Sequence, residues 1–129
     1  LRAARNAGIP VKKQTIDKSV EYLTKCTTPK GGIIYSLAHG AAVAGQERPP
    51  LTAAAIACAI GSGELTRAIE VMNPKQGEAP KGAARPPVVR WIEYCKENIP
   101  FAKGRVAHDE YQSYYYSQAI YMLGDDLYM

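Results

Sequence analysis

The fold of this chain is decided by residues 51–60, LTAAAIACAI, which carry no charge. A helix of this composition is apolar or small on every side, so it must be surrounded by protein. Its alanines allow neighbouring helices to approach closely, and Gly61 and Gly63 end it. We therefore predict a buried inner helix around which the rest of the chain packs.

Two further stretches, residues 15–26 and 87–98, are predicted to form amphipathic helices, the first capped by Thr15. Each places apolar residues at spacings of three and four, which predicts one buried face. These residues are Ile16, Val20 and Leu23 in the first helix, and Val88, Ile92 and Cys95 in the second.

Shorter or less regular patterns predict the remaining helices. They are residues 1–7, a short helix at 65–72, and a final helix at 108–123 that closes at Gly124. No stretch alternates apolar and polar residues as a half-buried strand does. The expected fold class is therefore all-α.

An internal repeat predicts how these helices are arranged. The amphipathic helices superpose at an offset of 72 residues, which places Glu21-Tyr22 on Glu93-Tyr94. The final helix superposes on the apolar one at an offset of 63 residues, which places Ile60-Gly61 on Leu123-Gly124. One such unit cannot bury its apolar face alone, so we expect stacked units with an inner layer of apolar helices and an outer layer of amphipathic ones.

Composition limits the classes of partner. The chain has 129 residues and a net charge of +4, and its basic residues are dispersed, so we expect no nucleic-acid partner. No stretch predicts a membrane span. Three cysteines without a CxxC pair are expected to be buried free thiols. Because the chain begins at Leu1 rather than Met, we expect residues 1–129 to be one domain cut from a longer protein.

Two sets of segments resemble a known family repeat. The first is IDKSVEYLTKC, GGIIYS and LTAAAIACAIGSGE, and the second is VVRWIEYCKENI and YYYSQAIYMLGDD. Both resemble the repeat of the squalene cyclase-like superfamily of terpenoid cyclases and protein prenyltransferases. This resemblance implies an α/α toroid of hairpins around a central cavity. The chain is then a partial toroid of two to three helical hairpins, completed by the remaining part of a longer chain or by a second copy.

The same resemblance supplies no catalytic centre. In prenyltransferases a zinc-binding His follows a Tyr, but Gln112 stands there in Asp109-Glu110-Tyr111-Gln112, so we predict no metal and no cofactor. Gly124-Asp125-Asp126 superficially resembles the acidic motif of squalene-hopene cyclases, but it lies at the wrong end of the helix, and a turn or C-terminal cap explains it without any chemistry. His108 and Asp109 form a possible acid/base pair, with helix capping as the alternative.

The tyrosines of the final helix are the candidate ligand-binding residues. Aromatic faces stabilise carbocations in terpenoid cyclases, and buried hydroxyls require partners, so we predict a groove for an apolar or isoprenoid ligand. Simple packing against the neighbouring inner helix is the alternative. The predicted groove residues are Tyr111, Tyr114, Tyr115, Gln118 and Tyr121.

These observations predict a non-catalytic binding or interaction module. The alternative is a part of an isoprenoid-processing enzyme, either a terpenoid cyclase or a prenyltransferase, whose catalytic residues lie mostly outside this chain. A scaffold for another protein is a third possibility. The sequence assigns no cellular compartment.

Overall fold

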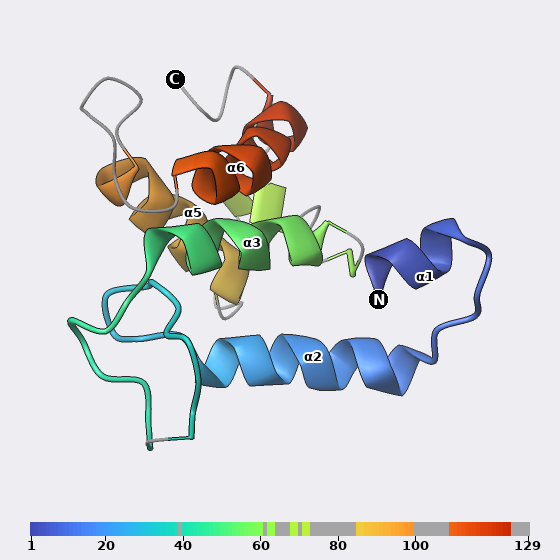
Figure 1. Cartoon of the computed structure of the whole chain (residues 1–129), viewed down its shortest axis with the longest axis horizontal. Helices are drawn as coiled ribbons and strands as arrows, with labels where there is room; N and C mark the ends of the chain where they lie inside the picture. The colour runs from blue at the N-terminus through green and yellow to red at the C-terminus, as the bar shows by residue number, and fades with distance from the viewer. Residues whose placement is uncertain are drawn as a thin grey trace.

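The computed structural model describes residues 1–38, 40–60, 62–63, 68–69, 71–72, 85–99 and 109–124. Its helices are α1 (Arg2–Asn6), α2 (Lys13–Lys25), α3 (Pro49–Ala59), α5 (Pro87–Asn98) and α6 (Asp109–Leu123) (Figure 1). No strand occurs in these ranges, where an isolated bridge joins Thr27 to Ile33. The all-α prediction is confirmed, whereas closure into a toroid stays a prediction.

Most helix boundaries agree with the sequence pattern. Gly124 ends α6 with a φ of 71°, and its N–H donates to the Ile120 carbonyl. The predicted cap at Thr15 is wrong, because α2 begins at Lys13, whose ammonium pairs with Asp17 at 2.8 Å. Of the short helix predicted at 65–72, residues 68–69 and 71–72 are described and are helical.

Helix α3 is central, as predicted, and packs on both α6 and α5. Its buried side chains are Thr52, Ala53, Ala55, Ile56, Ala57 and Ala59. Of these, Ala53, Ala55, Ile56 and Ala59 share one apolar core with Tyr116, Ala119 and Leu123 of α6. One part of the prediction is wrong: Cys58 is exposed rather than buried, so α3 is not enclosed on every side by the described residues. Cys26 and Cys95 are buried free thiols as expected.

Helix α5 buries side chains on two faces, whereas an outer amphipathic helix is expected to bury one. Val88, Ile92 and Cys95 are fully buried, as predicted, but Trp91 and Tyr94 are buried as well. The loop of residues 26–36 covers this second face. Two hydrogen bonds of 2.8 Å join it to α5: the Trp91 indole donates to the Thr27 hydroxyl, and the Arg90 guanidinium donates to the Thr28 carbonyl.

Helix α2 differs from α5 although the two share one apolar pattern. The predicted burial of one face is wrong, because no side chain of α2 is buried. Leu23 packs against the core from a half-buried position, and Ile16 and Val20 are also half-buried. In Figure 1, α2 runs below α3 in the opposite direction. None of the described helices is both long enough and apolar enough to cross a bilayer.

Candidate functional site

A hollow of about 540 Å³ lies where three distant segments meet. Tyr35 comes from the loop after α2, Tyr111 comes from the first turn of α6, and the segment 48–51 forms the start of α3. From that start, Arg48, Pro50 and Leu51 line the hollow. The lining is therefore mostly aromatic and apolar, with one cationic side chain.

Backbone hydrogen bonds hold the loop that carries Tyr35. The Ile34 N–H donates to the Cys26 carbonyl at 3.1 Å, and the Arg48 N–H donates to the Ile33 carbonyl at 3.0 Å. The Ile33 N–H in turn donates to the buried Thr52 hydroxyl of α3 at 2.9 Å. These bonds join the segment before Tyr35 to the start of α3, so both sides of the hollow belong to one scaffold.

Two glycines allow this loop to approach α5. Gly31 has a φ of 92°, a left-handed conformation that favours glycine, and a Cβ there would lie 2.9 Å from the Arg90 carbonyl oxygen. A Cβ on Gly32 would lie 2.7 Å from both Glu47 and the Tyr94 ring. Backbone conformation and close packing thus explain the Gly-Gly pair.

Glu47 is turned into the same loop. Its carboxylate accepts hydrogen bonds from the Thr28 hydroxyl and the Gly45 N–H, both at 2.7 Å. Burial raises the pKa of the Glu47 carboxyl, but these hydrogen bonds and the charge of Lys30 together hold it below its usual value. Glu47 is therefore ionised at neutral pH, and its carboxylate oxygens already accept hydrogen bonds from the loop.

Arg48 supplies the positive charge among the residues that line the hollow. Its backbone forms the N-cap of α3, and its carbonyl accepts from the Thr52 hydroxyl at 3.0 Å. Its side chain is exposed and forms no ion pair with any residue that the structure describes. An arginine that pairs with none of the described carboxylates can offer its donor fork to the carboxylate or phosphate of a ligand.

The structure brings three of the predicted groove tyrosines together. The ring of Tyr115 meets Tyr111 edge-on at 4.6 Å and Tyr114 edge-on at 5.0 Å between centroids. Tyr111 lines the hollow, and Tyr115 supports it from a half-buried position. Burial, and then the neighbouring Tyr115 hydroxyl, raise the pKa of Tyr111, so its hydroxyl stays protonated and able to donate at neutral pH.

The other predicted groove residues lie elsewhere on α6. Gln118 is half-buried, and its amide donates to the Tyr114 carbonyl at 3.2 Å. Tyr121 is 86% exposed and does not line the hollow. The buried tyrosine of this helix is Tyr116, which packs in the core.

The predicted acid/base pair cannot be placed. His108 lies outside the described residues, as do Asp125 and Asp126, and α6 begins at Asp109. Gln112, which the resemblance to prenyltransferases aligns with a zinc-binding His, is buried. Among the described residues, no cluster of His, Cys, Asp and Glu could hold a metal ion.

Sequence reasoning missed Tyr35 and Arg48 as lining residues. Tyr35 belongs to the GGIIYS motif, where an aromatic residue shortly after two glycines was a usable signal. Arg48 stands directly before Pro49-Pro50, which marks it as a helix N-cap but says nothing of its neighbours. The chain matches no protein-family model, no curated protein and no solved structure.

Proposed function

We propose that this chain is a helical binding module that takes an apolar, isoprenoid-type ligand with an anionic end in the hollow. The observation that carries the proposal is the lining. Tyr35, Tyr111, Pro50 and Leu51 supply apolar surface, and Arg48 supplies a cation without a protein partner among the described residues. The resemblance of the two repeats to terpenoid cyclases and prenyltransferases supports the same ligand class.

The apolar chain and the anionic end of the ligand bind through different interactions. The apolar chain gains about 0.8 kcal/mol for each CH₂ removed from water against the tyrosine and leucine surface. The anionic end is bound by the Arg48 guanidinium, which can donate two parallel hydrogen bonds to a phosphate. A ligand with both parts therefore binds more tightly than either part alone.

The test is calorimetric titration with farnesyl diphosphate, compared with farnesol and with inorganic diphosphate. We expect saturable binding of farnesyl diphosphate and much weaker binding of the two fragments. Tyr111→Ala removes lining surface and Arg48→Gln removes the cation, and each should weaken binding about tenfold, which corresponds to about 1.4 kcal/mol.

Tyr121→Ala is the matched control, because Tyr121 lies on the same helix but points to solvent. Absence of binding, or equal weakening by Tyr121→Ala, would contradict the proposal. Release of diphosphate from the bound ligand would instead favour the alternative, a part of an isoprenoid-processing enzyme.

A further inference from the structure

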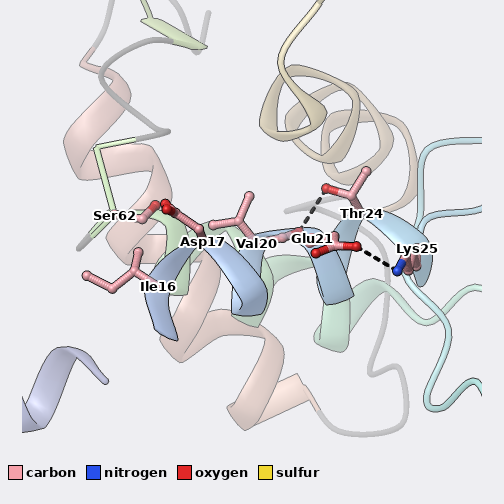
Figure 2. A pocket seen from close by; sticks show the side chains of 7 residues that line it. All are labelled: Ile16, Asp17, Val20, Glu21, Thr24, Lys25 and Ser62. Carbon is pink, nitrogen blue, oxygen red and sulfur yellow. Dashed lines mark hydrogen bonds and ion pairs between the residues drawn. The ribbon is translucent and has the colours of Figure 1, made fainter. Parts of the chain in front are cut away.

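A second surface of the molecule, independent of the hollow, is the apolar stripe of α2. Leu23, at the C-terminal end of the stripe, packs against the core. Ile16 and Val20 instead line an open groove of about 430 Å³. Six side chains of α2 border this groove, and Figure 2 shows Ser62, from the segment that follows α3, at the Asp17 end of the row. The C-terminal end of the stripe therefore contacts the core, whereas its N-terminal part, Ile16 and Val20, faces the open groove.

The repeat indicates what kind of element covers such a stripe. At the offset of 72 residues, Ile16 corresponds to Val88 and Val20 corresponds to Ile92. Both α5 residues have no exposed surface, and α5 packs against α3. The same apolar pattern is thus covered in one repeat and open in the other.

The helix that packs against α5, α3, is uncharged. Residues 49–59 of α3, PPLTAAAIACA, contain four alanines that are fully or almost fully buried, so a neighbour can approach the helix backbone closely. Small side chains permit such an approach because little volume separates the two helix axes.

The charges around the α2 groove fit an uncharged occupant. Lys13 pairs with Asp17 at 2.8 Å, and Lys25 pairs with Glu21 at 2.7 Å, both within α2. Figure 2 shows the Lys25–Glu21 pair. The bond to Lys25 holds the pKa of the Glu21 carboxyl below its usual value. The acidic groups beside the stripe are therefore neutralised by their own helix and require no charged partner.

We propose that the Ile16–Val20 stripe of α2 is a docking surface for an alanine-rich, uncharged α-helix of the α3 type, supplied by a further repeat of the same kind. Docking buries the half-exposed stripe as α3 buries its counterpart on α5. The surface would thus extend the stack of helices by one more unit.

The test uses a stapled, fluorescently labelled helix with the sequence of residues 49–59, titrated with the whole chain and followed by anisotropy. We expect saturable binding at a ratio of one to one. The double variant Ile16→Gln/Val20→Gln should weaken binding at least tenfold, since both substitutions place polar amides on the docking face.

The matched control is Lys18→Gln, which changes an exposed position of the same helix and should leave binding unchanged. Because α2 contributes no buried side chain, both variants should fold, and unchanged Trp91 emission verifies this. Absence of binding, or equal binding by the double variant, would overturn the proposal. Self-association of the unaltered chain that the double variant abolishes would also overturn it, because the occupant would then be a second copy.

Discussion

Replacing Thr27 by valine tests the link between the loop after α2 and helix α5. The Thr27 hydroxyl accepts a hydrogen bond from the Trp91 indole at 2.8 Å and donates to the Leu23 carbonyl at 2.9 Å. Valine keeps the shape of threonine but removes the hydroxyl. Trp91 is only 1% exposed, so its N–H then has neither the hydroxyl nor bulk water as an acceptor.

The expected loss follows from the cost of an unsatisfied buried donor. Leaving such a group without a partner costs about 1–3 kcal/mol, so we expect Thr27→Val to lower the free energy of unfolding by about 2 kcal/mol. That is a large share of the roughly 5–15 kcal/mol that holds a typical domain folded.

Thr24→Val is the matched control. Thr24 lies in the last turn of α2, three residues before Thr27, and its hydroxyl donates to the Val20 carbonyl at 2.8 Å, the same i−4 bond that the Thr27 hydroxyl forms. It differs in being exposed and in having no indole partner. We expect Thr24→Val to cost less than about 0.5 kcal/mol, typical of a surface substitution.

The assay is urea unfolding followed by the fluorescence of Trp91, the single tryptophan of the chain. The midpoint should fall while the dependence on urea stays unchanged. In a Trp91→Phe background, followed by circular dichroism, Thr27→Val should cost much less, because the donor is gone. Equal destabilisation by Thr27→Val and Thr24→Val would refute the reasoning.

Two further predictions concern the same core. Gly32→Ala places a Cβ 2.7 Å from Glu47 and the Tyr94 ring, so urea unfolding should show a loss of about 2–3 kcal/mol, and a loss below about 1 kcal/mol would contradict it. Burial raises the pKa of Cys95 to about 12, from about 9 in the unfolded chain, so the folded state keeps a proton that the unfolded state loses above pH 9. Stability should therefore fall by about 1 kcal/mol between about pH 8 and pH 10, and a pH dependence that Cys95→Ala does not reduce would exclude this cause.

Local sequence signals predicted most helix boundaries. The bounds of α5 coincide with the prediction, and α6 ends where Gly124 adopts its left-handed conformation. Proline and glycine act on the backbone that carries them, so their effect is visible without knowledge of the fold. Thr15 was misleading because a residue suited to a cap also fits inside a helix once Lys13 has begun it.

Local sequence patterns predicted the part of the candidate site that lies on one helix, and they did not predict the part that comes from other segments. Tyr111 and Tyr115 lie four residues apart on one helix, so helical spacing alone brings their rings together. Tyr35 and Arg48 reach the hollow through contacts between the loop, α3 and α6, and no local pattern encodes these contacts.

Helices α2 and α5 show most clearly where local information ends. Their shared spacing of apolar residues determined that both are amphipathic helices, because hydrophobic periodicity is a property of each helix alone. Whether that face is buried was decided by the tertiary structure. In α5 that face is buried, since Val88 and Ile92 are 0% exposed and α3 packs against the helix, whereas Ile16 and Val20 of α2 line an open groove. An apolar face is buried only when a second surface packs against it, and the sequence of one helix does not specify that second surface.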